Sequence, residues 1–164
     1  GLLGYLMPLP MMLLGVLFFL VIMFFSGSAV PAAGAEFEPV SYPSHPIMEW
    51  LLADGGDFTV VVLLACVAAP IIEEIMFRGL LYRYLREASL QRGLFSSALI
   101  SALVSSFLFA VIHPQGLAAV PILMGLAGGF CLVREWRASL LSSMVAHGLN
   151  NYIALSMTRF ILGG

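Results

Sequence analysis

Two adjacent carboxylates, Glu73 and Glu74, stand inside a long apolar stretch of the chain. Residues 58–72 before them carry no charge, and three apolar residues separate them from Arg78. One carboxylate at the centre of a bilayer costs about 2.5–3.5 kcal/mol on insertion scales. Two of them in such surroundings therefore need a charged partner or a chemical role, and the role open to a carboxylate is proton transfer.

The spacing around this pair gives the two carboxylates different neighbours. Glu74 and Arg78 stand four positions apart, so on a helix they share one face and are expected to form an ion pair. Glu73 projects about 100° away around the helix and has no cation on its own helix to pair with. We interpret Glu74 as a structural anchor and Glu73 as a free general base. The alternative is that both acids pair with arginines of this or another helix.

Two other apolar stretches carry polar side chains at the same spacing. Phe109 and His113 stand four positions apart, just before the turn sequence Pro114-Gln115-Gly116, where a histidine could also simply cap a helix end. His147 and Asn151 share a helix face in the same way. Their imidazole and carboxamide could donate two hydrogen bonds to one oxyanion, or they could form a polar clasp between helices.

These residues belong to a chain with the composition of a membrane protein. Of its 164 residues, 61% are hydrophobic and 10% are charged, whereas soluble domains carry about 25% charged residues. We predict an all-α, multispanning transmembrane helix bundle. Asp57 is expected to cap the second span, and the glycines of the fourth suit close helix contact. The five spans are expected near residues 2–25, 58–87, 95–113, 117–133 and 138–162.

The placement of arginine predicts the topology. The chain has no lysine, and six of its seven arginines flank the turns after the second and fourth spans: Arg78, Arg83, Arg86, Arg92, Arg134 and Arg137. The positive-inside rule places these turns in the cytoplasm. The segment 27–57, whose charged residues are all acidic, is then expected outside the plasma membrane. The chain has no basic stripe, so a nucleic-acid partner is not expected.

Helix geometry sets a condition on any shared site. We take a helical rise of ~1.5 Å per residue and assume that the turns near residues 88–94 and 136 lie at the same depth in the membrane. Glu73 would then lie ~22 Å, His147 ~16 Å and His113 ~29 Å above the arginine-rich side. A common site requires that differently placed turns, or a kink at Pro70, bring these heights together.

Taken in order, the three polar pairs resemble the motifs of a known family. The chain has Glu-Glu-x-x-x-Arg at 73–78, Phe-x-x-x-His at 109–113 and His-x-x-x-Asn at 147–151. These are similar to the motifs of the CPBP intramembrane proteases, a group that includes type II CAAX prenyl proteases and bacteriocin-processing, Abi-like proteins. The resemblance covers about residues 58–160, and it implies a bundle of helices that hydrolyses peptide bonds within or near the membrane.

The resemblance divides the chain into two parts. Residues 58–164 are expected to form a CPBP-like catalytic helix bundle. Residues 1–57 are expected to form an N-terminal transmembrane helix followed by an extracytoplasmic loop. Because the chain begins with Gly1 rather than Met, we also expect it to be truncated at its N-terminus.

The resemblance also implies roles for the first two motifs. Glu73 matches the catalytic glutamate of the family, and together with His113 it would activate a water molecule. Glu74 and Arg78 would hold the helix and orient the site. Phe109, which opens the second motif, would support His113.

By the same resemblance, His147 and Asn151 would stabilise the oxyanion. Glu73, His113 and His147 also make up a His₂Glu set of the kind that binds catalytic zinc. Such sites usually need a separate carboxylate base, which here would be Glu74, already paired with its arginine. We therefore favour a glutamate mechanism without a cofactor, and zinc is the alternative.

These expectations define one function and two competitors. The preferred function is an intramembrane endopeptidase acting on a membrane-associated, prenylated or leader peptide. The competitors are a proton-coupled transporter subunit, in which Glu73, His113 and His147 form a relay, and a non-catalytic membrane scaffold, in which the polar pairs join helices. The expected partners are a peptide or protein substrate and the lipid bilayer.

Overall fold

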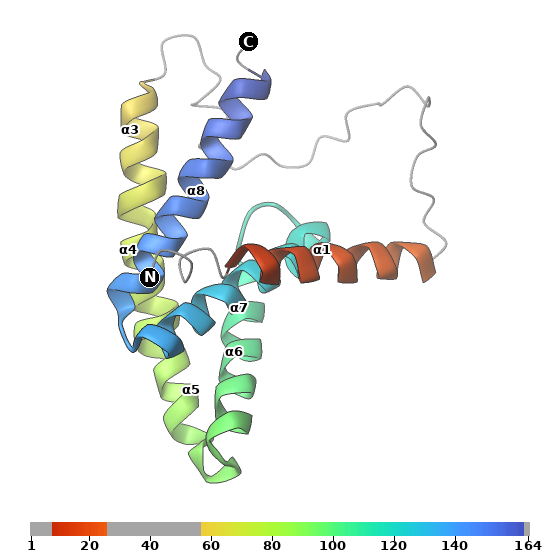
Figure 1. Ribbon diagram of the computed structural model, residues 1–164, viewed down its shortest axis with the longest axis vertical. Helices are drawn as coiled ribbons and strands as arrows, with labels where there is room; N and C mark the ends of the chain where they lie inside the picture. Colours follow the sequence, from red (N-terminus) through yellow and green to blue (C-terminus); the bar gives the residue numbers. More distant parts are fainter. Residues whose placement is uncertain (1–7, 26–56, 163–164) are drawn as a thin grey trace.

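The computed structural model describes residues 8–25 and 57–162, and every regular element within these ranges is a helix. The predicted all-α bundle is therefore confirmed (Figure 1). The segment predicted as an external loop, 27–57, lies outside the described residues except for Asp57, since residues 26–56 are not described. The elements are α1 (Pro8–Phe25), α3 (Phe58–Leu63), η2 (Leu64–Ala68), α4 (Ala69–Glu74), η3 (Ile75–Leu81), α5 (Tyr82–Ala88), η4 (Leu90–Arg92), α6 (Leu94–Val111), η5 (Leu117–Ala119), α7 (Val120–Arg137) and α8 (Leu140–Leu162).

The elements from α3 to α5 form one continuous helix of 31 residues, Phe58–Ala88. Asp57 caps its start as predicted, since its Oδ1 accepts a hydrogen bond from the Thr59 amide at 2.8 Å. Two π-helical segments, η2 and η3, interrupt the α-helical ladder. Such segments are often found at functional sites. Here they bracket the short α4, whose last two residues are the adjacent glutamates.

Three helices of the described residues are long and apolar enough to cross a membrane: Phe58–Ala88, Leu94–Val111 and Leu117–Arg137. These correspond to the second, third and fourth predicted spans. The first and fifth predicted spans coincide with α1 and α8. The polar side chains of His147, Asn150 and Asn151 lower the mean hydropathy of α8, so its passage through the membrane stays a prediction.

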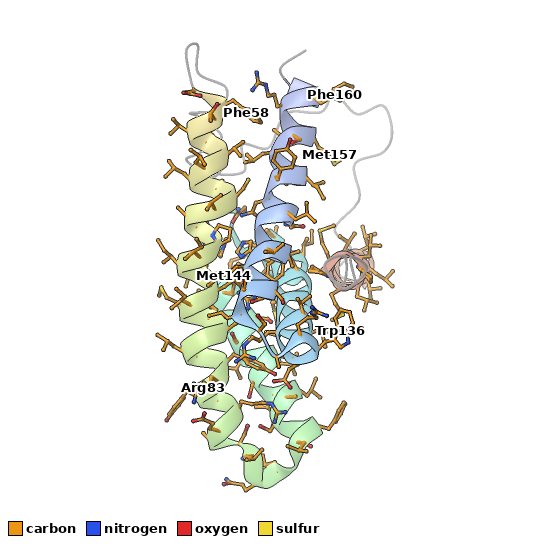
Figure 2. The ribbon with its side chains drawn as sticks, turned by 60° about the vertical axis from the view of Figure 1, so that its left-hand side comes forward. Phe58, Arg83, Trp136, Met144, Met157 and Phe160 are labelled. Atoms are coloured by element: carbon orange, nitrogen blue, oxygen red, sulfur yellow. The ribbon has the colours of Figure 1, made fainter. Side chains whose placement is uncertain are left out.

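The helices run in two directions (Figures 1 and 2). The long helix, α6 and α8 extend along the length of the molecule, whereas α1 and α7 lie across it. Phe58 and Phe160 lie at one end, and Arg83 lies toward the other (Figure 2). Arg86 of α5 bonds to Glu135 of α7, with Nη2 3.3 Å from Oε2, so the arginine-bearing ends of these two helices are neighbours.

Helix α1 packs along α7 with almost no space between the two backbones. A Cβ atom added to Gly125 would lie 2.3 Å from the carbonyl oxygen of Met11, and one added to Gly129 would lie 2.4 Å from the Cα of Pro8. These two glycines form a Gly-x-x-x-Gly pair, which allows two membrane helices to approach closely. The predicted role of the fourth span's glycines is therefore confirmed for Gly125 and Gly129.

We expect Gly125→Ala and Gly129→Ala each to reduce the free energy of unfolding by about 1–3 kcal/mol, because the added methyl group must push the α1 backbone away. Gly128→Ala is the matched control, since its Cβ would meet ordinary contacts at 3.8 Å. Thermal unfolding of the purified protein in detergent measures all of these variants. Equal unfolding midpoints for Gly125→Ala and Gly128→Ala would contradict the close contact.

Candidate active site

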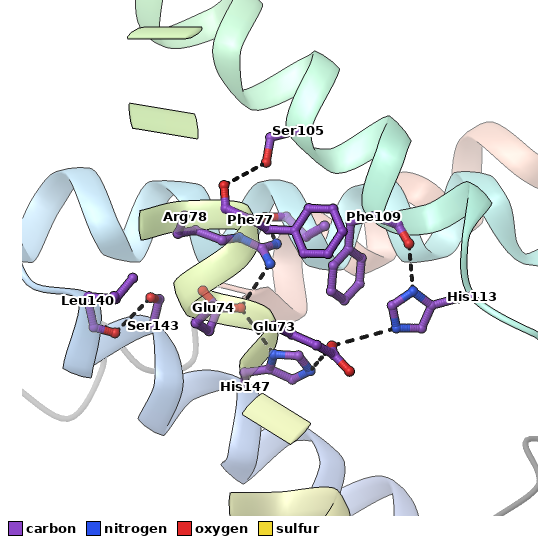
Figure 3. Close-up of polar contacts among 11 residues, drawn as sticks. Glu73, Glu74, Phe77, Arg78, Ser105, Phe109, His113, Leu140, Ser143 and His147 are labelled. Atoms are coloured by element: carbon purple, nitrogen blue, oxygen red, sulfur yellow. Dashed lines mark hydrogen bonds and ion pairs between the residues drawn. The ribbon is translucent and has the colours of Figure 1, made fainter. Parts of the chain in front are cut away.

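Three polar side chains from three different segments meet at one point (Figure 3). Glu73 ends α4 together with Glu74, His113 follows α6, and His147 lies in α8. The Oε2 atom of Glu73 is 3.7 Å from Nε2 of His147 and 3.8 Å from Nε2 of His113. The structure thus brings together the carboxylate and the two imidazoles singled out in the sequence.

The height estimated for His147 from ideal helices is wrong because the two turns are not level. Figure 1 shows the turn between α7 and α8 much nearer the middle of the molecule than the turn between α5 and α6. The chain turns at Ala138, whose φ of 48° ends α7. Because α8 starts nearer the middle of the molecule, His147 lies closer to the level of Glu73. His113 lies beyond the end of α6 at Val111, so it does not continue the ideal helix assumed for it.

The predicted ion pair between Glu74 and Arg78 is present and completely buried. Arg78 Nη1 donates to Glu74 Oε1 at 2.9 Å, and both side chains have 0% exposure. Arg78 Nη2 donates to the carbonyl oxygen of Ala127 in α7, also at 2.9 Å. Nδ1 of His147 lies 3.0 Å from the same Glu74 oxygen. This junction therefore ties α4 to both α7 and α8.

Two phenylalanine rings enclose the buried cation. The guanidinium carbon of Arg78 lies 4.8 Å from the ring centre of Phe109 and 5.2 Å from that of Phe130. Phe109 also lies against the His113 ring, with centroids 4.1 Å apart, and Phe130 stacks on His147 at 4.6 Å and 21°. Phe109 thus contacts both His113 and Arg78, and its supporting role stays a prediction. Phe130 was missed, because no polar residue at helical spacing marks it within its apolar span.

The hydrogen bonds of the two histidines identify which nitrogen faces Glu73. His113 Nδ1 lies 2.5 Å from the carbonyl oxygen of Phe109, and His147 Nδ1 contacts the paired carboxylate of Glu74. Both oxygens can only accept, so each Nδ1 donates. His113 therefore caps the helix end through Nδ1, and the Nε2 atoms of both rings are turned toward Glu73.

Asn151 contacts the long helix rather than the other site residues. Its Nδ2 donates to the carbonyl oxygen of Ala65 at 2.8 Å, in the π-helical segment η2. One turn earlier, a Cβ on Gly148 would lie 2.3 Å from the carbonyl oxygen of Cys66, so α8 lies directly on η2. The polar clasp proposed for this residue is thus present. Its oxyanion role stays a prediction, and a second amide hydrogen remains for it.

The cluster opens onto a cavity of about 510 Å³. Glu73, His113, His147 and Asn151 all line it, and so does Phe109. The rest of the lining consists of aliphatic side chains and two further carboxamides: Leu64, Ala65, Ala68, Ala69, Ile72, Leu123, Leu126, Ala154 and Leu155, with Gln115 and Asn150. A cavity of this size and character can hold a short apolar segment of a peptide beside the carboxylate.

The side chains are not arranged as a ready metal site. Within the described part of the chain, no group of three His, Cys, Asp or Glu side chains is placed to hold one metal ion. The zinc alternative therefore stays a prediction, and the chemistry below involves only the chain's own residues.

The fold and the cluster define a helical membrane protein that concentrates a carboxylate and two imidazoles beside an apolar cavity. Residues 55–153 match a family model described as Type II CAAX prenyl endopeptidase Rce1-like. This match covers more than half of the chain, so the chain belongs to that family of membrane endopeptidases, and the predicted family resemblance is confirmed. No curated protein and no solved structure matches the chain.

Removing the buried cation tests the junction. We expect Arg78→Met to reduce the free energy of unfolding by about 3–5 kcal/mol, because Glu74 would keep an unpaired buried charge. Arg83→Met is the matched control: Arg83 forms the same i, i+4 pair with Glu87 at 2.9 Å, but the side chains are 70% and 64% exposed. Its loss should cost less than about 1 kcal/mol. Similar losses in denaturant unfolding at both positions would show that the buried pair stabilises the protein no more than the exposed pair does.

Proposed function

We propose that this protein is an intramembrane endopeptidase of glutamate type, with Glu73 as the base that activates a water molecule. The observation that supports this most strongly is the meeting of Glu73 with the Nε2 atoms of His113 and His147 at the wall of one cavity. The name of the family adds the substrate class, a prenylated CAAX peptide held at the membrane.

The surroundings of the Glu73 carboxylate suit a general base. Among the described residues its Oε2 has no hydrogen-bond partner, although it is buried. The distances of 3.7 and 3.8 Å to the imidazoles are too long for direct hydrogen bonds, and they suit a bridging water molecule. Neutral His113, with Nδ1 donating to the backbone, offers Nε2 as an acceptor that orients this water.

The reaction follows from these positions. The water oxygen forms a bond with the carbonyl carbon of the scissile peptide, while one water proton passes to Glu73 and the carbonyl electron pair moves to oxygen. Glu73 then gives this proton to the peptide nitrogen, and the carbon–nitrogen bond breaks. Atoms and charge balance without an oxidant or a further reactant.

His147 can stabilise the oxyanion only in its doubly protonated form. Its Nδ1 already donates to Glu74, so a second hydrogen bond must come from Nε2–H. The Glu74 carboxylate lies on the opposite side of the ring, 3.0 Å from Nδ1. The remaining amide hydrogen of Asn151 would add a second donor, because oxyanion stabilisation by fixed donors lowers the barrier most strongly in sites that exclude water.

The two competing functions explain the geometry less well. A proton relay across a membrane needs groups distributed along its path, whereas Glu73, His113 and His147 converge on one point. Residues that only join helices bond across to them, as Arg78 does to Ala127 and Glu74 does to His147. Glu73 Oε2 makes no hydrogen bond to another described residue, and its side chain lines the cavity instead.

We also infer the orientation of the protein in the plasma membrane. The ends of α5 and α7 carry arginines and are joined by the Arg86–Glu135 pair. The positive-inside rule places these neighbouring ends in the cytoplasm.

We expect Glu73→Gln to abolish cleavage of an internally quenched, S-farnesylated CAAX peptide while leaving the thermal unfolding midpoint unchanged, because the amide cannot accept the water proton. Glu87→Gln, on the same helix with a 64% exposed side chain, is the matched control and should keep full activity. Cleavage by Glu73→Gln at the wild-type rate would exclude Glu73 as the base.

The choice between a glutamate and a zinc mechanism has its own test. We expect the purified enzyme to keep its activity after prolonged incubation with a strong chelator, because Glu73 acts directly on water. Cleavage of the same peptide is measured before and after, and after adding zinc. An enzyme that loses activity in the chelator and regains it with zinc would establish the metal alternative.

A further inference from the structure

The cavity lining contains neutral polar groups, and the proposed reaction uses only one of them, Asn151. Besides the acid and the imidazoles, its polar side chains are three carboxamides: Gln115, Asn150 and Asn151. None of the described residues lining it is lysine or arginine. The cavity can therefore recognise a ligand through the neutral hydrogen bonds of these carboxamides, and its described lining offers no lysine or arginine to a negatively charged group.

Two of these carboxamides are free to bind a ligand. Asn151 is occupied, since it donates to the Ala65 carbonyl at 2.8 Å. Gln115 Oε1 is buried without a hydrogen-bond partner in the described part of the chain. The carboxamide of Asn150 likewise makes no hydrogen bond to another described residue. A buried acceptor without a donor is unfavourable, so a bound ligand that supplies one would be stabilised here.

A peptide main chain has the complementary chemistry. Each peptide unit that enters an apolar cavity brings one donor and one acceptor that must be satisfied. A carboxamide carries the same two groups and can pair with a peptide unit through both of them. Gln115 lies two residues after His113, and Asn150 lies three residues after His147, so both stand close to the reacting groups.

We propose that Gln115 and Asn150 bind the main chain of the substrate peptide beside the scissile bond. The proposal rests on the proposed endopeptidase function and adds residues that hold the substrate in register with Glu73. These two residues recognise peptide units rather than particular side chains. The aliphatic part of the lining is left to receive the substrate's apolar side chains.

The test separates binding from chemistry. Gln115→Met and Asn150→Leu remove the hydrogen bonds with little change in volume, and each should raise KM about fivefold to tenfold with kcat changed less than about twofold. The assay uses the 164-residue chain in detergent and an internally quenched, S-farnesylated CAAX peptide. Gln91→Met is the control, because Gln91 is exposed and does not line the cavity; its KM should be unchanged.

A second measurement does not depend on how well a variant folds. Methylating the backbone nitrogens of the substrate, one at a time, should raise the wild-type KM about fivefold at one or more positions. The same methylation should have less than a twofold effect in Gln115→Met or Asn150→Leu, because the bond is already absent. Full additivity of methylation and mutation at every position would overturn the proposal, and so would variants whose kcat falls at constant KM.

Glu73→Gln, assayed in parallel, keeps the two proposals distinguishable. If Glu73→Gln is inactive and Gln115→Met and Asn150→Leu have the wild-type KM, the main-chain contacts are wrong and the endopeptidase function stands. If Glu73→Gln keeps the wild-type rate, the proposed mechanism is wrong, whatever the KM values of the carboxamide variants.

Discussion

The completely buried ion pair Glu74–Arg78 connects the long helix to α7 and α8, and the arrangement of the site depends on this connection. Burying two charges is unfavourable unless hydrogen bonds to other groups replace part of the lost hydration. Arg78 gains such a bond from the Ala127 carbonyl of α7, and Glu74 gains one from His147 of α8, although Arg78 Nε and Glu74 Oε2 have no partner in the described part of the chain. These bonds hold the long helix, α7 and α8 together. They also fix the position of His147 beside the cavity.

The two adjacent glutamates lie in different surroundings because the helix points them in different directions. Glu74 is fully buried and paired with Arg78 and His147, whereas Glu73 is partly exposed and lines the cavity. The π-helical segments on either side are fastened from neighbouring helices, by Asn151 to Ala65 and by Ser105 to Phe77 at 3.2 Å. The backbone that carries both acids is therefore held on each side of them.

The first helix extends the bundle beyond the matched family region, which begins at residue 55. It is nevertheless fitted to α7 at the distance of backbone contact, through Gly125 and Gly129. Since α7 also supplies Phe130 and the Ala127 carbonyl to the site, α1 supports from behind the helix that encloses the buried cation. Close packing without side chains between the backbones makes this support rigid.

The sequence by itself determined the helices, their apolar character and the three pairs at i, i+4 spacing, because these depend on local periodicity and composition. Even the Glu74–Arg78 bond was predictable, since both partners lie on one helix. Only the tertiary structure decided three contacts between helices. These are the contact of His147 with Glu74, the stacking of Phe130 on His147 and the hydrogen bond from Arg78 to the Ala127 carbonyl. They join residues 17, 49 and 73 positions apart that lie on different helices. Whether such residues meet depends on where each turn lies and how the helices cross, which spacing along one helix does not encode.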